Sequence, residues 1–220
     1  MSQTQEFTVE PLLMEDREEV LKLLKRTFFV DEPLNKKIQL CPTGECVELE
    51  EFCLSPLHEG LSFKAVDSKG KIVGVLINET CPLNDKIGIT LFERAEASKD
   101  PKFKKILHIL AKREEGSRLW EKFPNDDKLV EVKVAATDPD WRNKGILVAL
   151  VEETEKLLRQ RGVRLARLDS SSEFSARAAE RHNFTCYYKA RYTDIKMAGE
   201  PLIVPDPPHV YDRVFVKELF

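Results

Sequence analysis

The sequence predicts a single α/β domain, built on a mixed sheet of about seven strands with flanking helices. Three observations lead to this prediction. Runs rich in β-forming residues alternate with helical runs along the 220 residues. One strand–helix–strand unit near the centre predicts a parallel strand pair joined by a crossover. Neither a linker nor an internal repeat divides the chain, so residues 1–220 are expected to form one domain.

The first 80 residues predict one strand, two helices and a hairpin. Residues 7–12 alternate like a strand, and residues 14–28 repeat their apolar side chains with the period of a helix. The sequence DEPL at 31–34 is expected to end that helix, because the residue before a proline is pushed out of the α region. Residues 45–54 predict a short helix, and residues 61–80 predict a β-hairpin around the turn DSKG.

The rest of the chain predicts the central crossover and its neighbours. Asp100-Pro101 is a typical helix start, a cap followed by a first-turn proline. The helix that follows is expected to continue in a second piece towards Trp120. The later elements are expected to be strands at 128–137, 163–170, 184–195 and 212–219 and helices at 146–160 and 173–183.

Composition excludes several classes of protein. A net charge of −3 argues against a general nucleic-acid binder. No window is apolar enough for a membrane span, and the first 25 residues are too charged for a signal peptide. The five cysteines show no CxxC spacing, which predicts reduced thiols in a cytoplasmic protein. No two histidines have the spacing of metal ligands, so we expect no metal.

The turn Arg142-Asn143-Lys144-Gly145 stands between the predicted strand at 128–137 and the predicted helix at 146–160. The helix has no Ser, Thr, Asp or Asn directly before it to cap its free N–H groups. Those groups and the positive end of the helix dipole form a phosphate site, to which the two basic side chains add charge. The pattern therefore favours a phosphorylated cofactor over a turn that binds nothing.

Two such cofactors compete. A dinucleotide fold needs a G-x-G-x-x-G turn, whereas only one glycine is present here, so dinucleotide binding is disfavoured. The other candidate is coenzyme A, whose pyrophosphate can lie on the same kind of turn.

The sequence DPDWRNKGIL resembles the acetyl-CoA signature (Q/R)-x-x-G-x-(G/A) of the GCN5-related N-acetyltransferase superfamily. Arg142 takes the first position and Gly145 the glycine, while Leu147 replaces the small last residue. The segments DEPL, SSSEFSARAAERHNF and PPHVYDRVFVKEL are similar to the insect arylalkylamine N-acetyltransferase-like family. The resemblance implies an acetyl-CoA core at about 128–190 and an acceptor-side insert at about 81–127.

The resemblance also implies the cofactor contacts. In the superfamily, the strand before the signature splays from its neighbour and pairs with the pantetheine arm, and a backbone N–H meets the acetyl oxygen. On this chain the strand is residues 131–137, and Arg177 is a further candidate contact. The expected cofactor-binding residues are Val132, Val134, Ala135, Arg142, Asn143, Lys144, Gly145, Ile146, Leu147 and Arg177.

For catalysis, the resemblance points to Glu32 as the general base and to Ser171 and Ser175 near the thiol and the amine. From the residues alone, Glu32 could be a solvated helix terminus, and one or two serines of the cluster could be helix caps. Many acetyltransferases carry a tyrosine acid on the following helix, but the matching position here is Ala179. The departing thiolate must therefore take its proton from a serine or a water molecule, or leave without one.

For the acceptor, the resemblance implies that Pro33 shapes the pocket and that His209, fixed by neighbouring prolines, lies near it. An aromatic amine needs an aromatic lining, for which we expect Phe29, with Phe28 and Phe103 as further candidates. A loop histidine without such a role is the alternative for His209.

The leading hypothesis is thus a monomeric, cytoplasmic acetyltransferase that moves the acetyl group of acetyl-CoA to a small arylalkylamine. The reaction would be direct attack in a ternary complex, because no cysteine motif suggests a covalent intermediate. The alternatives are agmatine or another linear diamine as acceptor, or a degenerate acyl-CoA-binding module that acts through protein contacts. Neither a nucleic acid nor a membrane is an expected partner.

Overall fold

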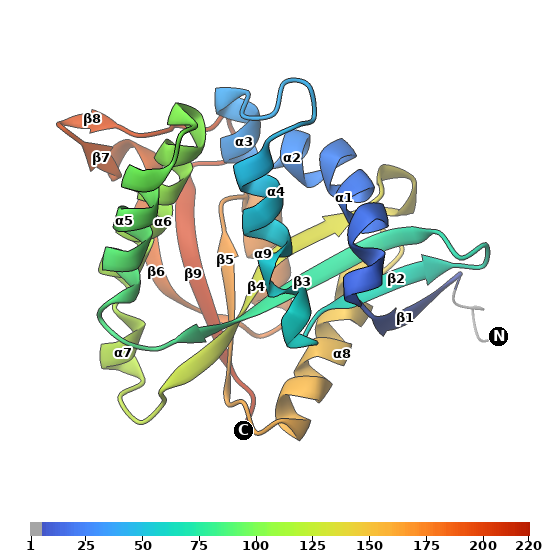
Figure 1. The fold of residues 1–220 in the computed structure, drawn as a ribbon. Helices are drawn as coiled ribbons and strands as arrows, with labels where there is room; N and C mark the ends of the chain where they lie inside the picture. Colours follow the sequence, from blue (N-terminus) through green and yellow to red (C-terminus); the bar gives the residue numbers. More distant parts are fainter. Residues whose placement is uncertain (1–5) are drawn as a thin grey trace.

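A computed structural model describes residues 6–220, and these form one seven-stranded sheet with helices on both faces (Figure 1). The strand order is β1-β2-β3-β4-β5-β9-β6, and a separate hairpin pairs β7 with β8. The predicted α/β fold with a mixed sheet of about seven strands is confirmed. The sheet strands are β1 (Phe7–Pro11), β2 (Phe63–Asp67), β3 (Ile72–Pro82), β4 (Lys128–Thr137), β5 (Leu165–Ser170), β6 (Thr185–Arg191) and β9 (Tyr211–Glu218), and the hairpin strands are β7 (Lys196–Met197) and β8 (Glu200–Pro201).

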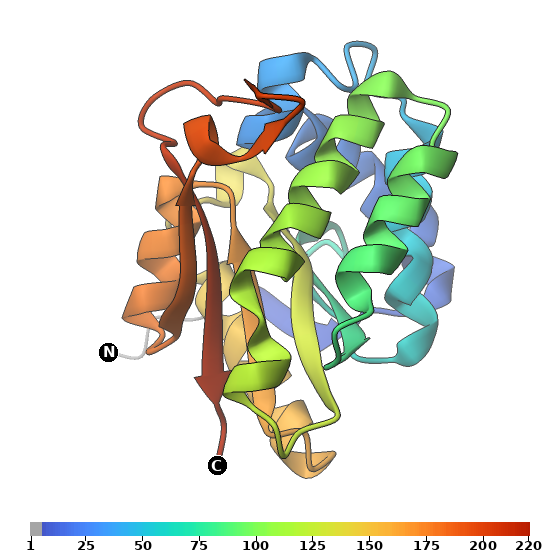
Figure 2. The same cartoon turned by 90° about the vertical axis from the view of Figure 1, so that its left-hand side faces the viewer.

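The helices form layers on the two faces of the sheet (Figure 2). Each layer packs on its own apolar core. One layer covers the face of the sheet that carries Val75 and Ile77, and the other covers the face that carries Val73 and Leu76. The first layer contains α1 (Arg17–Arg26), α2 (Phe28–Asp31), α3 (Pro33–Ile38), α4 (Val47–Leu54), α5 (Ile87–Ala97) and α6 (Pro101–Ser117); the second contains α8 (Ile146–Gln160) and α9 (Glu173–Arg181). The short α7 (Leu119–Lys122) covers a third, smaller cluster.

The predicted crossover is present: α8 joins β4 to β5, and these two strands are parallel. Their pairing covers only Val130–Val132 of β4 against Ala166–Leu168 of β5. Beyond Val132 the two strands diverge (Figure 1). The register of β4 against β3 shifts at the same point, where Asn78 faces Val132 and Ile77 faces Val134. The extra residue, Lys133, is a β-bulge, which bends a strand away from its neighbour.

Three segments differ from the predicted elements. The helix predicted at 14–28 breaks at Thr27, whose hydroxyl donates to the carbonyl of Leu23 at 2.6 Å. DEPL does not end the helical structure, because Glu32 caps a further helix, α3, with Pro33 in its first turn. Helix α5 lies in the insert, where no helix was predicted, and packs against α6.

The start of α8 lies directly on the sheet. A Cβ atom added to Gly74 of β3 would come within 2.5 Å of the Ile146 side chain, the first residue of α8. A larger residue than glycine at this position would therefore push the start of the helix outward.

Within residues 6–220, no helix is both long and apolar enough to cross a bilayer.

Candidate active site

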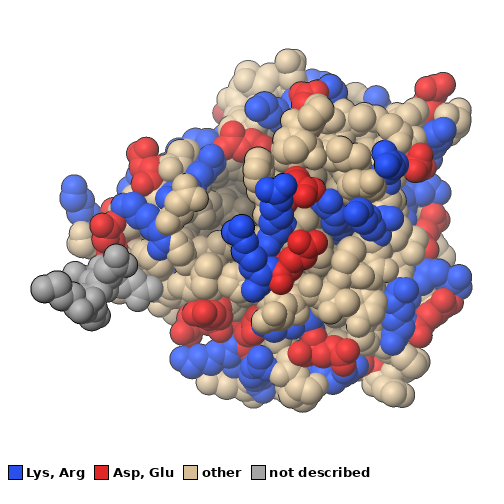
Figure 3. All heavy atoms as spheres, turned by 180° about the vertical axis from the view of Figure 1, so that it is seen from behind, with Lys and Arg blue, Asp and Glu red and all other residues tan. Residues whose placement is uncertain are grey.

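A cavity of about 780 Å³ opens where β4 and β5 diverge. From behind, the molecular surface is visibly hollowed, with charged side chains along the rim (Figure 3). The cavity is lined by the ends of the two strands, the turn before α8, the start of α9, the α2–α3 junction and the loop that holds Asp206, Pro207 and His209. Segments from the whole length of the chain therefore meet at one site.

The edge of β4 forms the floor of the cavity. Of the three residues expected to contact the cofactor through their backbone, Val132 and Ala135 line the cavity, whereas the side chain of Val134 is buried in the core on the opposite face of the sheet. Because β5 pairs only as far as Val132, the main-chain groups of 133–137 on this side have no strand partner among residues 6–220. An unpaired strand edge at a cavity can form hydrogen bonds with an extended amide-containing ligand.

The turn before α8 is built as an anion site. Asn143 and Gly145 have positive φ angles, +63° and +81°, and this conformation turns the chain sharply into the helix. No side chain among residues 6–220 caps the first N–H groups of α8. Free helix N–H groups and the positive end of the helix dipole favour a phosphate, so these residues fit the diphosphate of coenzyme A.

The predicted residues of this turn do not all reach the cavity. Arg142, Asn143 and Leu147 line it. Lys144 points elsewhere: its ammonium pairs with Glu6 at 2.6 Å and lies 4.4 Å from the centre of the Trp141 ring. The side chain of Ile146 is buried, so only the backbone of this residue is available to a ligand.

Arg142 is held by Asp31, which comes from the opposite side of the cavity. Its guanidinium donates to the Asp31 carboxylate at 2.7 Å, and both side chains are about half exposed. Arg177, the other arginine predicted to bind the cofactor, does not line the cavity. Its side chain is 62% exposed and lies 3.4 Å from Glu173 on the same helix, so a cofactor contact would need it to reorient.

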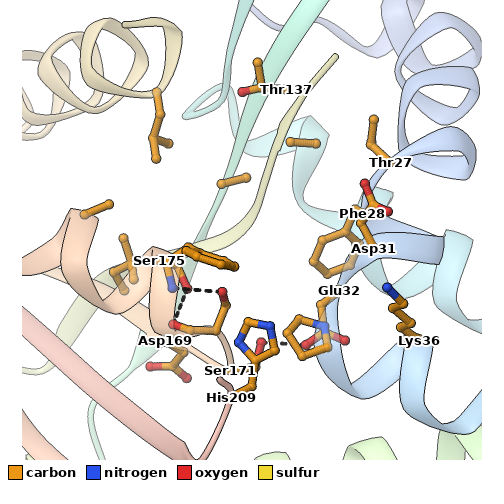
Figure 4. A pocket seen from close by; sticks show the side chains of 18 of the residues that line it. Thr27, Phe28, Asp31, Glu32, Lys36, Thr137, Asp169, Ser171, Ser175 and His209 are labelled. Atoms are coloured by element: carbon orange, nitrogen blue, oxygen red, sulfur yellow. Dashed lines mark hydrogen bonds between the residues drawn. The ribbon is translucent and has the colours of Figure 1, made fainter. Parts of the chain in front are cut away.

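Glu32 and Ser171 meet in the cavity although 139 positions separate them in the sequence (Figure 4). The Ser171 hydroxyl donates to Oε1 of Glu32 at 2.5 Å, and the N–H of Asn35 donates to Oε2 at 2.7 Å. Burial raises the pKa of Glu32 above its usual value, although these two hydrogen bonds oppose the shift. A carboxylate whose pKa is raised holds a proton more strongly than an ordinary glutamate and is therefore a better proton acceptor.

The peptide group of Ser171 is held by a buried chain of polar contacts that sequence reasoning missed. The Tyr192 hydroxyl donates to the Ser171 carbonyl at 3.1 Å and lies 3.5 Å from Asp212. Arg113 of α6 donates twice to the Asp212 carboxylate, at 2.9 and 2.6 Å. The sequence contains one signal that could have revealed these contacts: Arg113 and Asp212 are charged residues at positions where the helix and strand patterns require apolar ones.

Asp169, which lines the cavity, belongs to the same buried group of charges, as does Glu114, which pairs with Arg167. It accepts from Arg113 at 2.8 Å and from Arg167 twice at 2.7 Å. Burial alone would raise the pKa of Asp169, but the charges of Arg167 and Arg113 outweigh it and hold that pKa below its usual value. Asp169 is therefore an anion compensated by the protein.

The serine cluster divides into separate roles. Ser172 caps α9, since its hydroxyl accepts from the N–H of Phe174 at 3.1 Å. Ser175 lines the cavity, and its hydroxyl lies 2.7 Å from that of Ser170. Ala179, the position at which many acetyltransferases carry a tyrosine, is buried in the core.

On the acceptor side, Pro33 and His209 line the cavity together with Phe28. Phe29, the phenylalanine predicted to bind the substrate, is 1% exposed and packs in the core instead, because Phe28 occupies the face that meets the cavity. Phe103 is also buried in that core. Of these three phenylalanines, Phe28 is therefore the one whose side chain can contact a ligand in the cavity.

The His209 ring is held as a neutral imidazole. The N–H of Glu173 donates to its Nδ1 at 3.2 Å, which leaves the proton on Nε2, and the ring packs edge-on against Phe174. Burial lowers the pKa of His209, in agreement with this state. Within residues 6–220, no group of three or more His, Cys, Asp or Glu side chains is arranged to hold a metal ion.

No model of a known protein family matches the sequence. Among solved structures, arylalkylamine N-acetyltransferase 2 from Aedes aegypti is 30% identical with a TM-score of 0.90, covering 97% of this chain and 99% of that chain. A Drosophila melanogaster polyamine N-acetyltransferase, described as catalysing the formation of N-acetylagmatine, is 25% identical with a TM-score of 0.87, covering 96% and 99%. An agmatine N-acetyltransferase is 25% identical with a TM-score of 0.87, covering 97% and 99%.

The Asp31–Arg142 pair predicts a change in coenzyme A affinity. We expect Asp31→Asn to tighten binding by roughly two- to fivefold, because it frees Arg142 for the diphosphate and removes a nearby negative charge; an exposed ion pair is worth up to about 1 kcal/mol. Arg142→Ala should weaken binding. Isothermal titration calorimetry with coenzyme A measures both effects.

Glu6→Gln is the matched control, since it frees Lys144, which does not line the cavity, and should leave the affinity unchanged. Weaker binding by Asp31→Asn would show that Asp31 belongs to the binding site itself.

Proposed function

Because this chain belongs to the insect arylalkylamine N-acetyltransferase family, with the fold of the GCN5-related N-acetyltransferases, we propose that it acetylates the primary amine of a small arylalkylamine with acetyl-CoA as donor. The observation that carries the proposal is the Glu32–Ser171 pair. The pair supports the proposal because its carboxyl group lies in the same cavity as the unpaired edge of β4 and the turn before α8.

Glu32 would act as the general base. A primary amine of this class is mostly cationic at neutral pH, with a pKa near 10 like that of a lysine, and must lose a proton before it can attack. The raised pKa of Glu32 makes it a stronger base than an ordinary glutamate, while the Ser171 hydrogen bond keeps its carboxylate oriented into the cavity. Proton transfer by a positioned group contributes about 10²–10⁴ to the rate.

The unpaired edge of β4 would stabilise the charge that develops on the acetyl oxygen. A backbone N–H between 133 and 137 is the proposed donor, and one such donor is typically worth about 3 kcal/mol. Acetyl-CoA supplies the thioester, whose diphosphate would lie on the N–H groups at the start of α8. Transfer then occurs directly to the amine in a ternary complex.

Ser175 is the proposed proton donor to the departing thiolate. It lines the cavity at the start of α9, and the tyrosine position of other acetyltransferases is filled by the buried Ala179. The hydroxyl of Ser170, 2.7 Å from that of Ser175, could pass a proton on.

The lining of the acceptor side supports an aromatic amine. Phe28, Pro33, Pro207, Phe174 and His209 present apolar and aromatic surface to the cavity. A linear acceptor such as agmatine is the second candidate, since two structures of that activity are 25% identical to this chain.

All five cysteines are free thiols, in keeping with the expected cytoplasmic location, and we expect the enzyme to act as a monomer.

Removing the base tests the proposal directly. We expect Glu32→Gln to lower kcat/KM for tryptamine by roughly 10²-fold or more, because the amine then has no positioned proton acceptor. Coenzyme A affinity should stay within about twofold, since Glu32 is not part of the diphosphate site. Thiol release from acetyl-CoA measures the rate, and calorimetry measures the affinity. A variant that keeps full activity would exclude Glu32 as the base, and a wild-type protein that binds coenzyme A without amine-dependent thiol release would be a binding module.

The hydrogen bond from Ser171 predicts a shift in the pH profile. Glu32 is active when deprotonated, so kcat/KM falls as the pH drops through its pKa. Ser171 stabilises the carboxylate, and Ser171→Ala should therefore move this acidic limb to higher pH. Ser172→Ala is the control, because the Ser172 hydroxyl caps α9 and should leave the limb in place. An acidic limb at the same pH in all three proteins would show that Ser171 does not set the basicity of Glu32.

A further inference from the structure

The carboxylates of the cavity are nearly all neutralised by the protein. Four line it: Asp31, Glu32, Asp169 and Asp206. Three of them are paired, Asp31 with Arg142, Asp169 with Arg113 and Arg167, and Asp206 with Lys37 at 2.5 Å. Glu32 accepts hydrogen bonds from Ser171 and Asn35, and within residues 6–220 it forms no ion pair. Glu32 is thus the one carboxylate lining the cavity that has no ion-pair partner among residues 6–220, and the proposed function assigns it to the base.

Three basic residues line the cavity, and two of them are paired with carboxylates. Arg142 is paired with Asp31, and Lys133 turns to Glu79 and the Phe52 ring. Lys36 is exposed on α3 and lines the cavity, and no carboxylate within residues 6–220 forms an ion pair with it. Beyond the Lys37 hydrogen bond to Asp206 and the burial of His209, its ammonium group also lowers the pKa values of these two residues through space without pairing with either, so it stays available on this side of the cavity.

The position of Lys36 relative to Glu32 follows from helix geometry. The N–H of Lys36 donates to the carbonyl of Glu32 at 2.8 Å, so the two residues lie one helical turn apart on the same face. Figure 4 shows Lys36 on the same side of the cavity as Asp31 and Glu32, with Ser171 and His209 opposite. A substrate whose amine reaches Glu32 must therefore extend past the lysine or away from it.

We propose that Lys36 is a specificity-determining residue that disfavours acceptors carrying a second positive charge, such as agmatine and linear diamines. The inference rests on the proposed function and names the acceptor class more closely: an amine with one charge. A dication would have its first charge at Glu32, while its second charge would meet the ammonium of Lys36 one helical turn away. An arylalkylamine carries one charge, and its ring can pack on Phe28 and Pro33 instead.

The size of the effect follows from Coulomb's law. Two like charges held a few ångströms apart repel each other, and the repulsion falls as the surroundings become more like water; a tenfold loss in kcat/KM corresponds to about 1.4 kcal/mol. Side-chain mobility and salt reduce this repulsion, so a three- to tenfold effect is expected at low ionic strength, and less at high salt.

The test compares kcat/KM for tryptamine and for agmatine. Lys36→Met should raise the agmatine-to-tryptamine ratio three- to tenfold, and Lys36→Glu should raise it further because it adds a carboxylate for the second cation. Lys105→Glu is the matched control: it makes the same change in net charge at an exposed lysine of α6 that does not line the cavity. Its ratio should equal that of the wild type, and the effect at position 36 should shrink as salt is added.

The outcomes separate this inference from the proposed function. Turnover of tryptamine with an unchanged ratio in Lys36→Met and Lys36→Glu would overturn the role of Lys36, as would an equal change in Lys105→Glu. If no amine is turned over, the proposed function fails. Calorimetry would then measure the affinities of the two amines for the coenzyme A complex. A ratio of these affinities that changes in Lys36→Met and Lys36→Glu would support the role of Lys36, and an unchanged ratio would overturn it.

Discussion

The divergence of β4 from β5 is the constraint on which the site depends. The two strands pair over three residues and then separate at the bulge formed by Lys133. Unpaired backbone groups are costly unless they meet water or a ligand, so a sheet normally closes such a gap. Here the gap opens into the cavity, and α8 begins beside it because the chain passes directly from β4 into that helix. A strand edge and a helix N-terminus are thereby presented to one ligand.

A second constraint keeps the gap open. Asp169 and Asp212 are bound to Arg113 and Arg167 below the cavity, in a buried group that joins α6, β5 and β9. Arg113 and Arg167 are shared among three buried carboxylates, since Arg167 also pairs with Glu114, and loss of either arginine would leave buried charges unpaired and strongly destabilise the fold. Tyr192 connects this group to the carbonyl of the serine that faces Glu32. The insert helix therefore contributes to the position of the proposed catalytic groups.

Sequence patterns predicted those parts of the protein that depend on interactions between residues close together in the chain. The crossover, the uncapped start of α8 and the turn at 142–147 follow from short-range signals, and the structure contains all three. The meeting of Glu32 with the serine cluster came from family resemblance, since no local pattern brings such distant residues together. The prediction that Phe29 lines the acceptor pocket was wrong. Phe29 is buried and its neighbour Phe28 lines the cavity, because adjacent residues on a short helix point to different faces. Arg113 and Asp212 were missed because ion pairs between distant elements leave no periodic trace.

The central claim is that the open edge of β4 and the start of α8 together hold coenzyme A. Amide hydrogen exchange with and without saturating coenzyme A tests it most directly, because the method reports on the backbone N–H groups in question. The account predicts slower exchange at 133–137 and at 145–149, with little change in the buried strand β9. Saturable binding of coenzyme A that leaves both segments unprotected would contradict it.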